Sequence, residues 1–174
     1  MKKLIIDNDN IKNKMIDEKV TRVKALIINN KNEILLVNCY DEYQFPGGHL
    51  EREETPDDAI IREIKEETGM ETKKEDYIPF MMIEDYTRNY RNTDKNRCNI
   101  IIYYVLNKSC DIDVTKTNFS DYEKDGNFRL ELVPLEDIEG LLIKNSDDNS
   151  FSRIIATEML FVLKEYKKDR FKWI

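Results

Sequence analysis

Residues 48–70 read GHLEREETPDDAIIREIKEETGM, and both ends of a helix can be identified within them. Thr55 can cap the helix N-terminus, and Pro56 suits the first turn because its missing N–H would have no partner there. Gly69 can adopt the left-handed conformation that commonly ends a helix. The sequence therefore predicts a helix over residues 56–68.

At about 100° per residue, this helix has an apolar flank and an acidic flank. Ile60 and Ile64 lie on the apolar flank, which must face a core. The acidic flank carries Glu63, Glu66 and Glu67. Carboxylates three or four positions apart repel one another, so a helix selected for stability alone would carry lysines among them. Clustered carboxylates suit a hard cation such as Mg²⁺ or Mn²⁺, although a solvated acidic face would give the same helix composition.

The residues around these glutamates resemble the signature motif of the Nudix (MutT-like) hydrolase family. That motif combines a glycine, a glutamate, an Arg-Glu pair, a Glu-Glu pair, a second glycine and two aliphatic positions at fixed spacing. Every specified position is filled in this chain: Gly48, Glu54, Arg62, Glu63, Ile64, Glu66, Glu67, Gly69 and Met70. The flanking sequences Phe45-Pro46-Gly47-Gly48 and Leu132-Val133-Pro134-Leu135 also resemble the family. So many positions at fixed spacing make the resemblance specific.

The resemblance implies an α/β fold, namely the Nudix-type α/β/α sandwich around a mixed β-sheet. It also implies that Glu63, Glu66 and Glu67 hold the divalent metal together with the backbone carbonyl of Gly48. The residues matching Glu54 and Arg62 are expected to form an internal ion pair that fixes the shape of the loop and helix. These five charged residues are the catalytic set that the resemblance predicts.

The implied activity is a metal-dependent pyrophosphohydrolase that uses Mg²⁺ or Mn²⁺. Water attacks one phosphorus of the diphosphate bridge in a nucleoside diphosphate-X substrate: a nucleoside triphosphate, a nucleotide sugar or a dinucleoside polyphosphate. Metal ions neutralise the diphosphate and activate the water. Glu66 can take the proton of the water, but many relatives use an acid from a later loop. The candidates for that role here are Asp121, Glu123 and Asp125.

Two other functions on the same fold stay open at this stage. A non-catalytic nucleotide-sensing Nudix domain would bind without turnover, but such domains tend to lose the glutamates of the motif. A prenyl-diphosphate isomerase would need a catalytic cysteine and an acid partner, which the sequence does not identify.

Hydrophobic patterns outside the motif predict the remaining elements. Strands are expected over residues 21–27, 34–37, 78–83, 100–106 and 128–133, with the second pairing with the first as a hairpin. Helical spacing of apolar residues is found at Phe151, Ile154, Ile155, Met159, Val162, Leu163 and Tyr166. We expect one domain over residues 20–174, preceded by a lead-in segment over residues 1–19. The polar stretch 107–127 is long enough to be functional or mobile.

The polar loop 86–97 interleaves tyrosines with basic residues in an otherwise acidic protein. Arginine suits phosphate through its planar fork, and tyrosine can stack on a base. We hypothesise that this loop lies over the metal site and binds the substrate, through Tyr86, Arg88, Tyr90 and Arg91. A hairpin tip with no substrate role is the competing interpretation. His49, at an unspecified motif position, is expected to pack or to contact solvent.

The charge balance, 28 Lys and Arg against 35 Asp and Glu, gives a net charge of −7. Such a balance disfavours a stable nucleic-acid complex, but it allows a small phosphorylated substrate because a bound cation reverses the local field. Cys39, Cys98 and Cys110 have no disulfide or zinc spacing. No signal-peptide core or membrane-spanning stretch is found. We therefore expect a cytoplasmic protein with a small nucleotide substrate, and a possible homodimer through the last helix.

Overall fold

The computed structural model describes residues 1–12, 15–147 and 150–169. It contains two β-sheets. The larger, mixed sheet has the order β1 (Lys2–Ile6), β5 (Tyr77–Thr87), β6 (Arg97–Leu106) and β2 (Glu18–Ile27). The smaller, antiparallel sheet has the order β4 (Glu42–Gln44), β3 (Glu33–Cys39) and β7 (Arg129–Pro134). The α-helices are α1 (Pro56–Thr68), α2 (Asp121–Asp125), α3 (Ile138–Asp147) and α4 (Ser150–Asp169).

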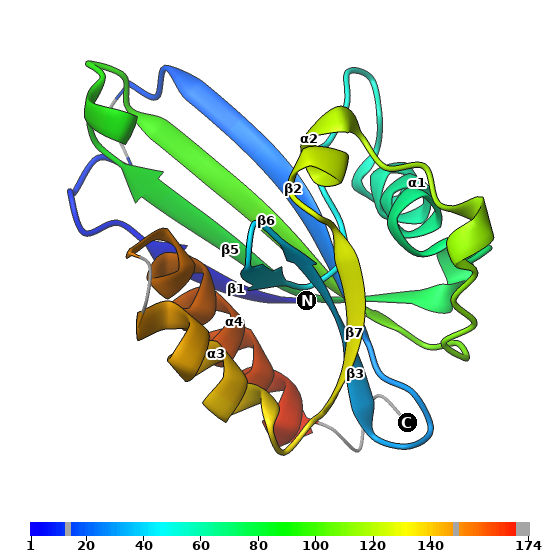
Figure 1. Ribbon diagram of the computed structural model, residues 1–174. Helices are drawn as coiled ribbons and strands as arrows, with labels where there is room; N and C mark the ends of the chain where they lie inside the picture. The colour runs from blue at the N-terminus through cyan, green and yellow to red at the C-terminus, as the bar shows by residue number, and fades with distance from the viewer. Residues whose placement is uncertain (13–14, 148–149, 170–174) are drawn as a thin grey trace.

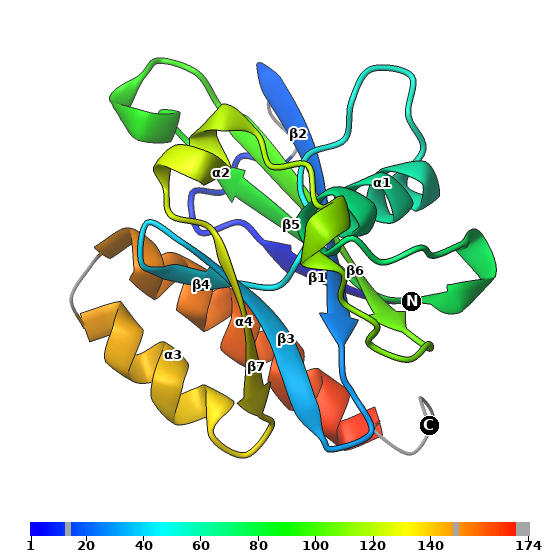
Figure 2. The same cartoon turned by 45° about the vertical axis from the view of Figure 1, so that its right-hand side comes forward.

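The helices lie on both sides of the strands, with α1 on one side and the α3–α4 pair on the other (Figures 1 and 2). Alternation along the strands produces two cores, because successive side chains point to opposite faces. The core beneath α1 contains Val23, Ala25, Ile27, Ile60 and Ile64. The core beneath α4 contains Leu26, Tyr103, Val105, Met159 and Leu163. The predicted α/β/α sandwich around a mixed sheet is confirmed.

The prediction that residues 21–27 and 34–37 pair as a hairpin was wrong. The two segments are joined by an isolated antiparallel bridge between Ile28 and Ile34. One edge of β2 pairs in parallel with β6. The other edge is occupied by the loop that precedes α1: the amide of Val23 donates to the Gly48 carbonyl, and the amide of Ala25 donates to the Pro46 carbonyl, both at 2.9 Å. Since both edges of β2 are occupied, β3 turns away and starts the second sheet.

The segment 1–19 contains a strand that the sequence did not predict. Residues 2–6 form β1, an edge strand parallel to β5, and Ile11 is fully buried. The apolar run in β1 is too short to indicate its pairing partner, which lies about eighty residues later in the chain. Part of the expected lead-in is therefore built into the larger sheet. Helix α3 was also not predicted.

The polar stretch 107–127 lies along α1. The amide of Asp113 donates to the Thr68 carbonyl at 3.0 Å, and the amide of Asn118 donates to the Glu66 carbonyl at 2.8 Å. These bonds pair carbonyls at the helix C-terminus that have no partner within the helix. The stretch then forms the short helix α2. Its length is explained by this path from the end of β6 along α1 to β7.

The last helix has the predicted apolar stripe. Met159, Val162, Leu163 and Tyr166 are buried in the core, whereas Ile154 is 66% exposed and does not pack there. The side chain of Phe151 lies outside the described part of the structure. Within the described ranges, no helix combines the length and the apolar character that a bilayer span requires.

Candidate active site

Helix α1 has the ends that the sequence predicts. The Thr55 side chain accepts a hydrogen bond from the Asp58 amide, and Gly69 ends the helix at φ 69°. The short connection from β4 leads through Phe45-Pro46-Gly47-Gly48, which lies against β2. The glycine turn therefore runs along the edge of β2, and α1 packs against the same strand.

Glu67 points back from α1 to this turn. Its carboxylate accepts a 2.7 Å hydrogen bond from the amide of Gly47, and the residue as a whole is only 5% exposed. Gly47 has a φ of 127°, a conformation that favours glycine. A Cβ at this position would overlap the carbonyl oxygen of Val23. The turn thus needs glycine both for its backbone conformation and for its close contact with β2.

Lys24, on β2, lies behind the same turn. Its ammonium group donates to the Gly47 carbonyl at 2.8 Å and to Oε1 of Gln44 at 3.0 Å. Burial raises the pKa of Glu67 to about 8, while the charge of Lys24 and the Gly47 amide act in the opposite direction. A cation near this carboxylate therefore favours its ionised form. Lys24 was not predicted from the sequence, although a lysine on the same strand face as buried Leu26 was a signal for it.

Gly48 provides space for a second carboxylate. A Cβ on Gly48 would overlap Oε1 of Glu63 and lie 2.5 Å from Cδ and Oε2. The side chain of Glu63 is 13% exposed, and burial raises its pKa while the hydrogen bond from Arg62 lowers it. The absent Cβ thus allows a carboxylate to lie directly against the backbone of Gly48.

Arg62 connects the acidic residues. It donates two 2.9 Å hydrogen bonds to Glu54, from Nε and from Nη2, and this is the ion pair that the motif predicts. Its Nη1 donates to Glu63 at 2.9 Å and to Glu66 at 3.2 Å, and Nη2 also reaches the His49 carbonyl at 3.0 Å. The hydrogen bond from Arg62 lowers the pKa of Glu54. This arrangement fixes the loop after Gly48 against α1.

The three predicted ligands lie on one side of α1 but do not converge on a single point. Arg62 lies between Glu63 and Glu66, and Glu67 is turned toward Gly47. In the described part of the chain, no group of three metal-binding side chains comes together. The donor set nevertheless fits a hard divalent cation, because it consists of carboxylate oxygens beside a backbone carbonyl with no Cβ in the way.

The three later acids differ in their position. Glu123 lies close enough to Glu67 for its charge to raise the pKa of that carboxyl further, although less than burial does. Asp121 is fully exposed and lies 3.6 Å from Lys124. Asp125 is also exposed. Of the three candidates, Glu123 is the one that the fold brings near the motif glutamates.

The loop 86–97 is only partly available for a substrate. Arg88 is bonded to Asp9 through its backbone amide and its guanidinium group. The Tyr86 hydroxyl donates to Glu84 at 3.1 Å, and the Tyr90 ring lies 4.2 Å from the guanidinium carbon of Arg97. Arg91 has a weaker contact, 5.4 Å from the Tyr90 ring. All four predicted substrate residues thus have contacts within the protein, and the contact of Arg91 is the weakest.

His49 has a structural contact as well. Its Nε2 accepts a 3.0 Å hydrogen bond from Nε of Arg22. Burial, together with the charge of Arg22, lowers the pKa of His49 to about 4, so the imidazole is neutral at pH 7. The expectation that His49 packs rather than serves as a ligand agrees with this contact.

Comparisons with known proteins match this architecture. The NUDIX domain family model matches residues 18–154. Two curated relatives are both named 8-oxo-dGTP diphosphatase. The protein of Escherichia coli (strain K12) is 36% identical over 52 residues, or 26% of this chain and 40% of that protein. The protein of Proteus vulgaris is 33% identical over 64 residues, or 33% of this chain and 57% of that protein. The chain thus matches about half of the length of these relatives.

A similar fold is found in the solved structure of a NUDIX hydrolase from Nitrosomonas europaea. The TM-score is 0.54 at 16% sequence identity, and the match covers 87% of this chain and 90% of that one. At this identity, the similarity establishes the fold alone.

Proposed function

The chain belongs to the Nudix family, and on that premise we propose that it is a metal-dependent pyrophosphohydrolase acting on a nucleoside diphosphate-X substrate. The observation that carries the proposal is the contact between α1 and the glycine turn. Glu67 is bonded to Gly47, and Glu63 occupies the space left by the missing Cβ of Gly48. A stable helix alone does not require carboxylates to be packed against a glycine backbone in this way.

Glu63, Glu66, Glu67 and the Gly48 carbonyl would hold Mg²⁺ or Mn²⁺. When bound, the cation would supply charge neutralisation for the diphosphate and acidify the attacking water. The chain's own residues prepare this site. Arg62 and Glu54 fix the loop against α1, and Lys24 holds the Gly47 carbonyl from behind.

Two carboxylates are candidates for the proton acceptor. The side chain of Glu66 is 37% exposed, so it is accessible to a water molecule. Glu123, on α2, lies near Glu67, but one of its oxygens accepts the Ser120 amide at 2.6 Å. We assign Glu66 to the ligand set first and Glu123 to the proton acceptor, because a ligand carboxylate is less basic than a free one.

The names of the two curated relatives support a nucleoside triphosphate as the first substrate class to test. Nucleotide sugars and dinucleoside polyphosphates share the same diphosphate bridge and belong in the same panel. The retention of all motif glutamates argues against a non-catalytic sensor. A cytoplasmic location and a homodimer through α4 stay predictions.

The test is phosphate or pyrophosphate release across a nucleotide panel, measured with and without Mg²⁺. We expect metal-dependent turnover that falls at least about 100-fold in Glu67→Gln, a size typical for the loss of one electrostatic group at a reacting phosphate. Glu75→Gln, an exposed glutamate outside the motif, is the matched control and should keep the parent rate. Metal-independent turnover, or full activity in Glu67→Gln, would exclude the proposed function.

A further inference from the structure

Two tyrosine rings lie in contact at the protein surface near the motif. Tyr40 follows β3 and Tyr122 lies on α2, and their ring centroids are 5.0 Å apart with an interplanar angle of 50°. Tyr40 is 48% exposed and Tyr122 is 68% exposed. Aromatic rings that pack together usually do so in a core, where their area is removed from water. This pair instead offers an aromatic surface to solvent.

The backbone under Tyr40 is strained. Tyr40 and Asp41 form the turn between β3 and β4 with φ values of 53° and 60°, where glycine and asparagine are the usual residues. Its amide donates a 2.7 Å hydrogen bond to the Gly126 carbonyl. A Cβ on Gly126 would lie 2.7 Å from the Tyr40 ring. The surrounding contacts therefore hold Tyr40 in a left-handed backbone conformation that a residue with a bulky side chain rarely adopts. Such backbone strain is common at functional positions.

The segment that leads into α2, and so to Tyr122, is bonded to the motif helix: the amide of Asn118 donates a 2.8 Å hydrogen bond to the Glu66 carbonyl. Burial raises the pKa of the Cys39 thiol, and the charges of Glu123 and Glu67 raise it further. Cys39 precedes Tyr40 in the chain, and Glu123 follows Tyr122. Each tyrosine is therefore next in sequence to a residue that lies within electrostatic range of Glu67.

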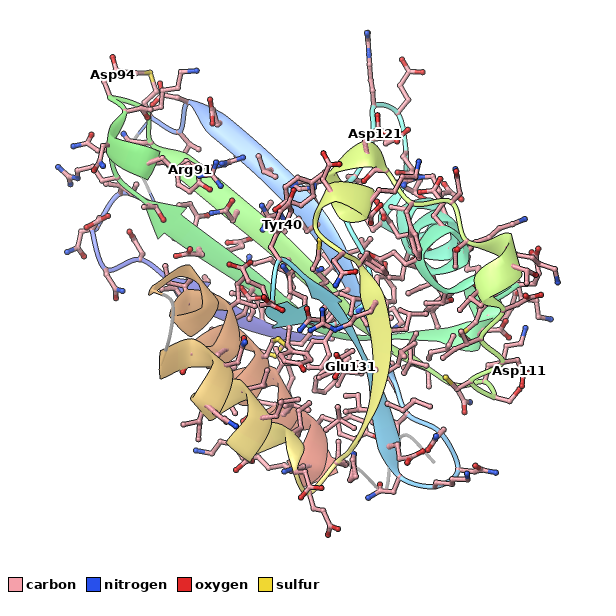
Figure 3. All side chains as sticks on the ribbon, viewed as in Figure 1. Tyr40, Arg91, Asp94, Asp111, Asp121 and Glu131 are labelled. Atoms are coloured by element: carbon pink, nitrogen blue, oxygen red, sulfur yellow. The ribbon has the colours of Figure 1, made fainter. Side chains whose placement is uncertain are left out.

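Arg91 approaches the pair from the loop 86–97. In the view of Figure 3, the Arg91 side chain extends from the loop in the direction of Tyr40. Burial raises the pKa of the Tyr122 hydroxyl, and the charge of Arg91 opposes this shift, so the guanidinium group lies within electrostatic range of the ring. No ion pair of Arg91 is found among the residues that the structure describes. Arg91 is exposed, and its guanidinium carbon lies 5.4 Å from the centre of the Tyr90 ring.

We propose that Tyr40 and Tyr122 form a stacking platform for the base of the nucleotide substrate, with Arg91 contacting the same base. The proposal rests on the proposed function and adds the location of the base. An aromatic face stacks on any nucleobase, and guanidinium groups stack on aromatic planes. The diphosphate then extends from the platform toward Glu67, on the side where Glu123 lies.

The variants can separate stacking from folding. Tyr40→Asn removes the ring and places a residue that favours the left-handed backbone, so we expect an unchanged or higher melting temperature. Tyr122→Leu removes the second ring from an exposed position, and Tyr122→Phe keeps the ring. Lys124→Ala, on the same short helix, is the control.

The measurement is calorimetric binding of a non-hydrolysable imido analogue of a nucleoside triphosphate, in parallel with inorganic triphosphate, which has no base. We expect Tyr40→Asn and Tyr122→Leu to weaken analogue binding about 10-fold, the size of one base–aromatic stack. Inorganic triphosphate should bind equally to all variants, and Tyr122→Phe and Lys124→Ala should bind the analogue like the parent.

Equal affinity of the parent and the two ring-deletion variants for the analogue would overturn the platform, as would an equal loss for inorganic triphosphate. A parent that binds no nucleotide analogue would also overturn it. The proposed function has a separate readout, because it is tested by Mg²⁺-dependent turnover of the parent. A parent that turns over nucleotides while the ring variants keep full affinity would reject the platform alone.

Discussion

The amide of Gly47 donates a 2.7 Å hydrogen bond to the carboxylate of Glu67, twenty residues later in the chain. This bond joins the glycine turn to the acidic flank of α1. It also explains why Glu67 is buried while Glu66, one position earlier, has a side chain that is 37% exposed. The two adjacent glutamates therefore have different surroundings, and Glu67 is the one that is bonded to the glycine turn.

Gly48→Ala is expected to leave the chain folded but to weaken Mg²⁺ or Mn²⁺ binding at least about 10-fold. The added Cβ would occupy the place of the Glu63 carboxylate, which must then move. Calorimetric titration with Mn²⁺ measures the effect. Gly140→Ala, where an added Cβ meets nothing within 4 Å, is the control and should bind the metal normally. Unchanged affinity in Gly48→Ala would show that Glu63 does not need this space.

Lys24→Met is expected to lower both stability and turnover. The substitution removes the donor to the Gly47 carbonyl and to Gln44 and leaves these part-buried acceptors without that partner, a loss of about 2 kcal/mol in the free energy of unfolding. Urea unfolding and Mg²⁺-dependent turnover measure the two effects. Lys19→Met replaces an exposed lysine on the same strand and should change neither. A stable and fully active Lys24→Met variant would contradict the positioning of the turn by Lys24.

Asp57→Asn is expected to lower the free energy of unfolding at pH 7 but not at a pH well below 3.8. Asp57 lies 2.7 Å from the Lys74 ammonium and accepts a 2.9 Å hydrogen bond from the Tyr104 hydroxyl. The Lys74 contact lowers the pKa of Asp57 below its ordinary value of 3.8, against the effect of burial. A lowered pKa gives stability that is present above 3.8 and lost as pH falls through the folded-state value.

The expected difference between Asp57→Asn and the parent at pH 7 is about 1 kcal/mol, because Lys74 is largely exposed and its charge is screened. Urea unfolding at pH 7 and at several lower pH values measures it. A difference that stays constant as the pH falls well below 3.8 would show that the effect does not come from ionised Asp57.

Glu123→Gln is expected to reduce turnover about 100-fold with little change in KM, as the loss of a proton acceptor does. Asp125→Asn, an exposed acid on the same short helix, should retain the parent rate. Steady-state kinetics with excess Mg²⁺ separates kcat from KM. If Asp125→Asn and Glu123→Gln have the same rate as the parent, the acceptor lies within the motif, and Glu66 becomes the candidate.

The local sequence was sufficient for α1, and the resemblance of the motif to a known family predicted the Glu54–Arg62 pair. Helix ends depend on residues within one turn of each other, such as Thr55 with Asp58, and can be found without knowledge of the rest of the chain. Most strands were predicted from the local alternation of apolar and polar residues. The α/β/α sandwich followed from the resemblance of the motif to a family with that fold.

The tertiary structure alone decided the pairing of β1 with β5, the separation of β3 from β2, and the contacts of Lys24 and Tyr40. Each of these joins residues far apart in the chain, and their contact depends on which strand edges are already occupied and which side chains fit. Local patterns show which face of a strand is apolar but not what packs against it. The acidic helix was therefore determined by the sequence, while the surroundings that distinguish Glu67 from Glu66 were decided by packing.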